Sequence, residues 1–143
     1  MKVHINLSEN LHFIASIRHF NKIHIDEPES FHGTDKGPSS VEYVLIGVGG
    51  CLGSTLLFCL QKKNIKLKSL EIIVEGKLKH SEPYKHLRLK NINCEIHISI
   101  YGEESALLDE CIKIFQKYCV VSESIINGIP INIDIKKKKK IKV

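Results

Sequence analysis

The chain has 143 residues, which fits one compact domain, and its apolar fraction of 43% and charged fraction of 26% are typical of a globular protein. The net charge of +5 comes largely from lysines at positions 136 to 140 and 142, and the chain has only two arginines, Arg18 and Arg88. Nucleic-acid binding requires basic residues spread over a face, so we expect no nucleic-acid partner. We predict one domain over residues 1–135 and a solvated lysine-rich tail over 136–143.

The N-terminal region has the pattern of antiparallel strands. Apolar and polar side chains alternate over residues 11–18, the period of a half-buried strand. Residues 23–25 read as a short partner strand across a turn at 20–21. Residues 26–38 are rich in turn-forming residues and predict a loop.

The next segment, residues 39–64, predicts a long helix. Ser39 followed by Glu42 is a plausible capping box, and residues 43–60 carry no charge. That length reaches the threshold for a membrane span. Glycines and hydroxyl residues dilute the apolar character, however, so we favour a helix that is buried on every side, whose glycines let another backbone approach closely.

The second half of the sequence predicts two strands, two helices and a last strand. Alternation predicts strands over 70–78 and 87–100, with a turn at 80–83, a bulge near Asn91 and Cys94 in the core. An amphipathic helix is expected over 103–118 and a short helix over 120–126. Residues 129–135 predict an edge strand because Pro130 interrupts it. Segregated strands and helices are typical of an α+β fold.

The five cysteines indicate thiol chemistry rather than a disulfide scaffold. Their number is odd, no export signal precedes them, and we expect a cytoplasmic protein with reduced thiols. No C-x-x-C motif and no histidine at zinc-finger spacing occurs, so we predict no metal site and no cofactor. The cysteines are Cys51, Cys59, Cys94, Cys111 and Cys119.

Two cysteine contexts resemble the OsmC/Ohr family. The stretch from Gly37-Pro38-Ser39 through Glu42 to Gly49-Gly50-Cys51 is similar to the family signature on its central helix. The sequence Tyr118-Cys119-Val120-Val121-Ser122 is similar to the family's second cysteine motif. The resemblance covers nearly the whole chain.

The resemblance implies an α+β, OsmC-like fold: an intertwined homodimer in which antiparallel sheets wrap around long central helices. It also implies a thiol-dependent peroxidase that reduces organic hydroperoxides, with a dithiol as reductant. In that case Cys51 attacks the peroxide and Cys119 resolves the product. Because a free thiol is mostly protonated at neutral pH, Cys51 needs a partner that favours its thiolate. It lies three turns into its helix, too far for the dipole of that helix to help. In the organic-hydroperoxide branch of the family this partner is an arginine held by a glutamate, which points to Arg18 and Glu42, although that branch has its glutamate one position earlier.

Several alternatives remain open at this stage. Glu42 has a purely structural role available as a helix cap, and Arg18 as a surface strand residue. Cys59 and Cys111 are interpreted as packing residues, with a role as alternative resolving thiols as the competing hypothesis. Two other functions compete with the peroxidase: a non-catalytic dimeric module that binds a small apolar ligand in the dimer cleft, and a membrane helix hairpin.

Overall fold

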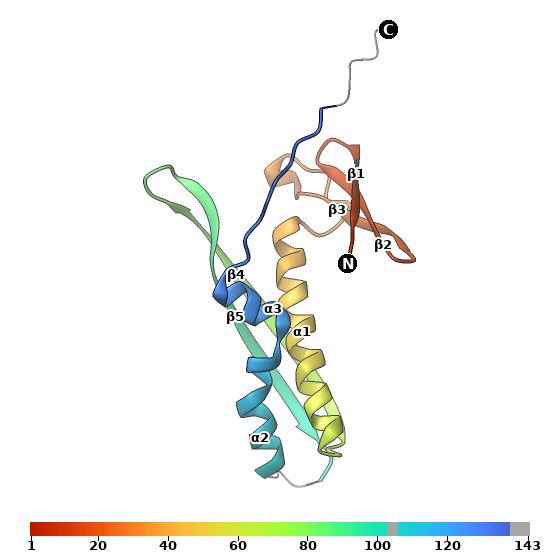
Figure 1. The fold of residues 1–143 in the computed structure, drawn as a ribbon, viewed down its shortest axis with the longest axis vertical. Coiled ribbons are helices and arrows are strands. Elements are labelled where there is room, and N and C mark those ends of the chain that lie inside the picture. Colours follow the sequence, from red (N-terminus) through yellow and green to blue (C-terminus); the bar gives the residue numbers. More distant parts are fainter. Residues whose placement is uncertain (103–105, 138–143) are drawn as a thin grey trace.

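A computed structural model describes residues 1–102 and 106–137 and has the predicted α+β architecture. A three-stranded sheet lies beyond the start of a long helix, and a two-stranded hairpin and the shorter helices pack along that helix (Figure 1). Both sheets are antiparallel. The strands are β1 (His4–Glu9), β2 (His12–Ile17), β3 (Phe20–Ile25), β4 (Leu67–Ser81) and β5 (His86–Ile100). The helices are α1 (Ser40–Lys62), α2 (Ala106–Ile114) and α3 (Val120–Asn127), with 3-10 turns η1 (Glu29–Phe31) and η2 (Phe115–Tyr118).

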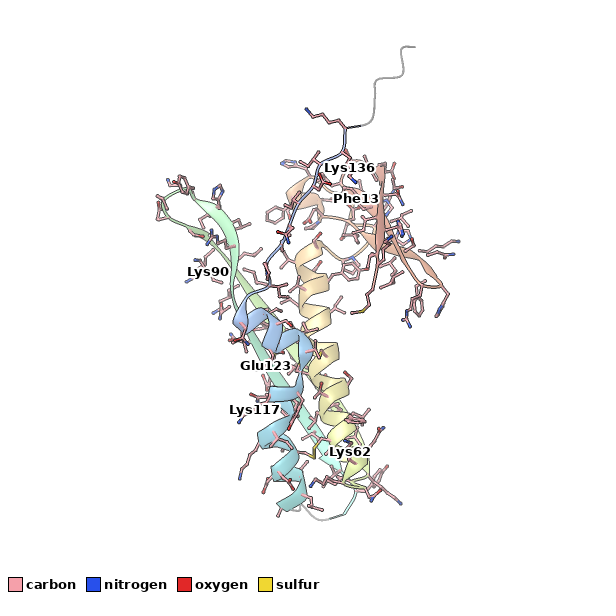
Figure 2. All side chains as sticks on the ribbon, viewed as in Figure 1. Phe13, Lys62, Lys90, Lys117, Glu123 and Lys136 are labelled. Atoms are coloured by element: carbon pink, nitrogen blue, oxygen red, sulfur yellow. A yellow bond between two sulfur atoms is a disulfide. The ribbon has the colours of Figure 1, made fainter. Side chains whose placement is uncertain are left out.

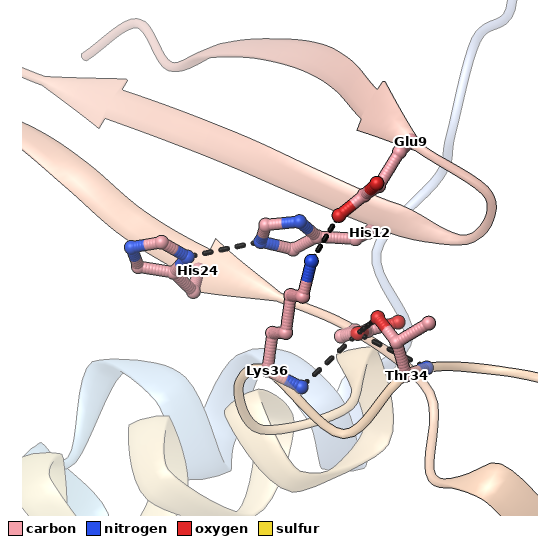
Figure 3. Close-up of polar contacts among 6 residues, drawn as sticks. Glu9, His12, His24, Thr34 and Lys36 are labelled. Atoms are coloured by element: carbon pink, nitrogen blue, oxygen red, sulfur yellow. Dashed lines mark hydrogen bonds and ion pairs between the residues drawn. The ribbon is translucent and has the colours of Figure 1, made fainter.

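The N-terminal sheet has the order β1-β2-β3. The sequence predicted β2 and β3 but not β1, whose six residues are all exposed and whose apolar side chains therefore do not mark a buried face. The loop that follows β3 is organised by Asp26, which is 1% exposed. Its carboxylate accepts hydrogen bonds from the Thr34 hydroxyl at 2.6 Å and from the backbone N–H groups of Glu27, Thr34 and Lys36. Thr34 and Lys36 are labelled in Figure 3. Burial raises the pKa of Asp26, but these hydrogen bonds outweigh it and lower the pKa to about 2.

Helix α1 begins with the predicted capping box. The Ser39 N–H donates to the Glu42 carboxylate at 2.7 Å, and the Glu42 N–H donates to the Ser39 hydroxyl at 3.3 Å. The prediction that this helix is buried on every side is wrong for the single chain. Its buried residues form one face, and the opposite face is open, with Ile46 and Phe58 more than half exposed. The buried residues are Val48, Gly49, Leu52, Gly53, Leu56 and Leu60.

The glycines of α1 serve two different faces. A Cβ at Gly49 or Gly53 would lie 2.9 Å from Val74 and 2.8 Å from Ile72, so these glycines let β4 approach the helix. A Cβ at Gly47 or Gly50 would meet nothing within 4 Å. The close approach predicted from the glycine cluster is therefore made by strand side chains on one face, while the other face is unfilled.

The hairpin β4–β5 matches the predicted strands and extends them towards the turn. The pairing shifts register between Lys77 and Leu78, which lie opposite Asn91 and Leu89, so the predicted bulge is confirmed. Ile72 and Val74 on β4 face α1 and supply the contacts to its glycines. The far end of the hairpin projects away from the helices (Figure 1).

The predicted helix over 103–118 is divided in the structure. Residues 103–105 lie outside the described residues, α2 covers 106–114, and a 3-10 turn completes the segment. Leu108, Cys111 and Phe115 form the buried stripe, but Tyr118, which the pattern placed on it, is 71% exposed because the tighter 3-10 turn rotates it away. The short helix α3 and its end at Gly128 agree with the prediction.

The last predicted strand, 129–135, is not a strand in this chain. Residues 128–137 are extended but have no strand beside them to complete a ladder, and the isoleucines at 129, 131, 133 and 135 are each more than 60% exposed. Residues 138–143 of the predicted tail lie outside the described residues. Within the described ranges, α1 is the one helix long and apolar enough to span a membrane by length and composition, and 28% of its most apolar window is buried.

Candidate functional site

Cys51 and Cys119 lie together where α1 meets the start of α3. Cys51 is half-buried in the middle of α1, and Cys119 is fully buried at the N-cap of α3. The Cys119 thiol hydrogen-bonds to Cys51 and lies 3.1 Å from the Ser122 hydroxyl. The two thiols that the sequence singled out are therefore direct neighbours.

The surroundings of Cys51 favour its thiolate. Burial alone raises the pKa of this thiol. Hydrogen bonds from the backbone N–H groups of Val121 and Val120 and from the side chains of Cys119 and Thr55 outweigh burial, and they lower the pKa of Cys51 below its ordinary value. A lowered pKa is the property that distinguishes a reactive cysteine from an inert core cysteine.

The source of this effect differs from the one expected. The sequence placed Cys51 three turns into α1, where we expect little help from the dipole of that helix, and it therefore predicted a side-chain partner. The structure supplies a second helix instead: Val120 and Val121 are the first two residues of α3, and their N–H groups have no partner within that helix. The signal that could have identified them is the short helix predicted immediately after Cys119.

Glu42 is held in the first turn of α1 by its capping interactions. The Ser39 backbone N–H lowers the pKa of the Glu42 carboxyl, with a further contribution from the Ser39 side chain. Glu42 is nine residues from Cys51, which is about 13 Å along the axis of α1. Within this chain it makes the contacts of a helix cap.

Arg18 lies in the tight turn between β2 and β3 with a left-handed backbone, φ 54°. Its guanidinium lies 5.3 Å from the centre of the Phe20 ring. This turn belongs to the N-terminal sheet, which lies beyond the start of α1, whereas Cys51 lies three turns into that helix (Figure 1). The structure therefore joins Cys51 to Cys119 but brings neither Arg18 nor Glu42 to them within one chain.

A pocket of about 370 Å³ is lined by neighbours of the cysteine pair but by neither Cys51 nor Cys119. Val48 and Leu52, which flank Cys51 on α1, form part of its wall, and Phe115 and Ser122 lie across from them. Cys94 also lines it and is exposed, so its predicted place in the core is wrong: it faces the helices but borders a space that no side chain fills. Burial raises the pKa of Cys94, as does the charge of Cys119. The walls are mostly apolar and suit an apolar ligand.

The remaining cysteines are paired with each other. Cys59 and Cys111 form a disulfide between α1 and α2, with Cα atoms 5.8 Å apart (Figure 2). The expectation that all five thiols are reduced does not hold for this pair. Within residues 1–102 and 106–137, no three histidine, cysteine, aspartate or glutamate side chains are grouped as metal ligands.

The sequence of residues 33–134 matches the family model described as OsmC-like protein. The chain belongs to the OsmC-like family. The family match covers both Cys51 and Cys119, and it confirms the resemblance drawn from their contexts. A comparison with curated proteins finds no match.

Solved OsmC-like structures share the fold at low sequence identity. An OsmC-like protein from Mycoplasma pneumoniae has a TM-score of 0.72 at 22% identity, over 87% of this chain and 85% of that one. An OsmC-like protein of unknown function from Vibrio cholerae has a TM-score of 0.74 at 9% identity, over 86% and 91%. An organic hydroperoxide resistance protein of Bacillus subtilis has a TM-score of 0.58 at 17% identity, over 86% and 87%. At these identities the likeness shows the fold alone.

Proposed function

We propose that this protein reduces organic hydroperoxides with Cys51 as the attacking thiol and Cys119 as the resolving thiol. The observation that carries the proposal is the pair itself: a cysteine with a lowered pKa, hydrogen-bonded to a second free thiol. Some relatives with this fold are named organic hydroperoxide resistance proteins, which supports the same reaction class.

The reaction proceeds in three steps. The Cys51 thiolate attacks one peroxide oxygen, the O–O bond breaks, and the alcohol leaves with a proton while Cys51 becomes a sulfenic acid. The Cys119 thiol then attacks the Cys51 sulfur, and a disulfide forms as water leaves. An external dithiol returns both cysteines to thiols and is itself oxidised to a disulfide.

The apolar pocket beside Cys51 suits the organic part of such a substrate. Its walls, Val48, Leu52 and Phe115, are also core residues, so their positions are fixed by packing. The same pocket favours the alternative function, a module that binds a small apolar ligand without turnover. Peroxide consumption separates the two, because a binding module consumes none.

We also propose that the protein works as a homodimer built on the open face of α1. Gly47 and Gly50 have free space above them, and Val44 and Ile46 on the same side are exposed. A second copy crossing there would bury apolar surface that monomeric proteins rarely expose. Residues 129–135 carry alternating exposed isoleucines and have no strand partner among residues 1–102 and 106–137, so we expect them to pair with the second copy.

The dimer is also where the proposed role of Arg18 belongs. Because Arg18 does not reach Cys51 in its own chain, we propose that it acts on Cys51 of the other subunit, where its charge would favour the thiolate further. Glu42 would hold that guanidinium with the carboxylate oxygen that its cap leaves free. Arg18→Ala should then slow peroxide reduction while Arg18→Lys retains part of the rate; equal rates in wild type and Arg18→Ala would remove Arg18 from the site.

The decisive experiment measures cumene hydroperoxide consumption with dithiothreitol as reductant. Cys51→Ser should abolish turnover. Assayed without dithiothreitol, which would reduce a sulfenic acid directly, Cys119→Ser should consume one equivalent per site and leave a sulfenic acid that a dimedone probe labels on Cys51. Cys59→Ser is the matched control, since it replaces a cysteine eight residues away on the same helix whose disulfide dithiothreitol opens in the assay, and it should retain activity. Turnover that survives in Cys51→Ser would overturn the proposal.

A further inference from the structure

A second pair of cysteines lies outside the site just described. Cys59 on α1 and Cys111 on α2 are joined, and their Cα separation of 5.8 Å falls within the range that a disulfide requires without backbone movement. The two residues are 52 positions apart in the sequence, so their meeting depends on the fold. Neither takes part in the proposed peroxide reaction.

The two cysteine pairs, Cys51 with Cys119 and Cys59 with Cys111, each join α1 to the segment that runs from α2 to the start of α3. Cys59 follows Cys51 by eight residues and Cys111 precedes Cys119 by eight, so the pairs are nested. Eight helical residues span about 12 Å along α1. Sulfur atoms at that separation cannot exchange directly, because thiol–disulfide exchange requires contact between the attacking and attacked sulfurs. The second pair is therefore a separate couple and not a step in a relay.

One sulfur of this pair can be reached from outside and the other cannot. Cys111 is 0% exposed, whereas Cys59 is half-buried and lines an open pocket of about 580 Å³. Lys62 lies at the end of α1 (Figure 2), and it borders that pocket together with Lys63 and Glu110. The near edge of this pocket, Ser54, lies about one turn beyond Gly50, where we place the second copy, and Cys59 lies about two and a half turns beyond it. An external thiol would therefore attack Cys59.

The charges around the pocket favour an anionic reagent. The Lys62 ammonium lies 4.6 Å from the centre of the Phe58 ring and has no acidic partner among residues 1–102 and 106–137, and Lys63 pairs with Glu110 at 2.9 Å. A thiolate or a carboxylate that enters this pocket meets a net positive charge. The same charges favour the thiolate form of an attacking thiol.

We propose that Cys59 and Cys111 form a second reversible dithiol–disulfide couple, which exchanges through Cys59 with anionic low-molecular-weight thiols and disulfides of the glutathione class. In the oxidising direction the Cys59 thiolate attacks the small disulfide and releases one thiolate. Cys111 then loses its proton and attacks the Cys59 sulfur, and the second small thiolate leaves, so two thiols are oxidised and one disulfide is reduced. This couple does not depend on the peroxidase.

The bond holds the segment that carries Cys119. Cys111 lies in α2, which leads through η2 directly to Cys119 and the start of α3. In the oxidised form α2 is fixed covalently to α1, and in the reduced form only packing by residues such as Leu108 and Phe115 holds it. We therefore expect the oxidised protein to be the more stable form.

The test uses the full chain with Cys51→Ser and Cys119→Ser combined, which removes the proposed reactive pair. The native protein is equilibrated in buffers with varied ratios of reduced to oxidised glutathione, quenched in acid, alkylated and mapped by mass spectrometry. We expect one two-electron transition that joins the Cys59 and Cys111 peptides, and a higher melting temperature on the oxidised side. Cys59→Ala in the same background is the control and should show neither change.

A second measurement addresses the charge of the reagent. The disulfide should be reduced faster by 2-mercaptoethanesulfonate than by cationic cysteamine, and Lys62→Gln should reduce this rate ratio. No Cys59–Cys111 bond at any glutathione ratio, or a bond that opens only in denaturant, would overturn the proposal. So would a rate ratio that Lys62→Gln leaves unchanged. Peroxidase activity that survives in Cys51→Ser would contradict the proposed function and would leave the Cys59–Cys111 couple untouched, so the two proposals fail separately.

Discussion

Val120→Pro removes one hydrogen bond to Cys51 while leaving the helix that supplies it intact. Val120 is the first residue of α3, a position where proline is tolerated because its missing N–H has no partner within the helix. The preceding residue, Cys119, has φ −75° and ψ 102°, in the extended region that a residue before proline adopts. The Val120 side chain is 73% exposed, so the substitution disturbs little packing.

The size of the effect follows from the energy of the lost bond. A hydrogen bond to a charged group contributes about 1.5–3 kcal/mol. We take the lower end, because Cys51 is only half-buried and water replaces part of the lost interaction. Since one pKa unit corresponds to about 1.4 kcal/mol, the pKa of Cys51 should rise by about one unit.

The assay is the rate at which a small aromatic disulfide modifies Cys51, followed between pH 5 and 10 by peptide mass spectrometry. At low pH the thiolate fraction of the variant is about tenfold lower. Its intrinsic nucleophilicity is about threefold higher, because nucleophilicity rises with pKa. Val120→Pro should therefore react about threefold more slowly than wild type at low pH and about threefold faster at high pH.

Val120→Ala is the matched control, because it keeps the N–H and should have the wild-type profile. Circular dichroism and melting temperature check that α3 is retained in the proline variant. If a folded Val120→Pro has the same pH profile as Val120→Ala, the N–H of Val120 does not tune Cys51, and the assignment of α3 as the source of the lowered pKa is refuted.

Four further predictions follow from other parts of the structure. Because folding lowers the pKa of Cys51, its ionisation stabilises the reduced protein above the unfolded pKa and ceases to do so as pH falls through the folded pKa. Urea unfolding should therefore show the free energy of unfolding of wild type rising relative to that of Cys51→Ala between pH 6 and 9. A difference between the two that does not change with pH would contradict this. Leu60→Ala, at a position 0% exposed, should lower the free energy of unfolding by about 3 kcal/mol in urea titrations, whereas exposed Gln61→Ala should change it little. Asp26→Asn should destabilise the fold at neutral pH. The difference in free energy of unfolding between wild type and Asp26→Asn should narrow as pH falls from about 4 towards 2, where wild-type Asp26 becomes protonated. A difference independent of pH would show that the charge of Asp26 is unimportant. Removal of residues 136–143 should leave melting temperature and peroxide consumption unchanged, and a large drop in either would show that the lysine run is structural.

Local patterns in the sequence were enough to predict most of the elements. Ser39 and Glu42 marked the start of α1, and alternation identified β4 and β5 together with the bulge opposite Lys77. These features depend on neighbouring residues, so they are visible in one sequence. The last strand could not be assigned correctly because a strand requires a partner. The alternation of isoleucines at 129–135 predicts that one face is covered, but it does not indicate which segment covers it.

The sequence predicted which cysteines form the candidate site, but it did not predict how the site is arranged around them. The contexts of Cys51 and Cys119 identified both thiols, and the structure brings them into hydrogen-bonding contact. The N–H groups of Val120 and Val121 could be located only through the short helix predicted after Cys119, because a backbone donor is the same in every residue except proline. The pairing of Cys59 with Cys111 likewise depends on how α2 packs against α1, which spacing alone does not determine.

The N-cap of α3 makes the thiolate of Cys51 a structural element as well as a reactive one. A helix of eight residues is short, and Cys119, its N-cap, makes no side-chain capping bond to it. The first two N–H groups instead donate to Cys51, so a side chain from α1 caps α3 across the interface between the two helices. When Cys51 forms a disulfide, its negative charge is lost and this cap weakens. The ordering of α3 should therefore follow the oxidation state of the pair, and amide hydrogen exchange in its first turn should quicken in the oxidised protein.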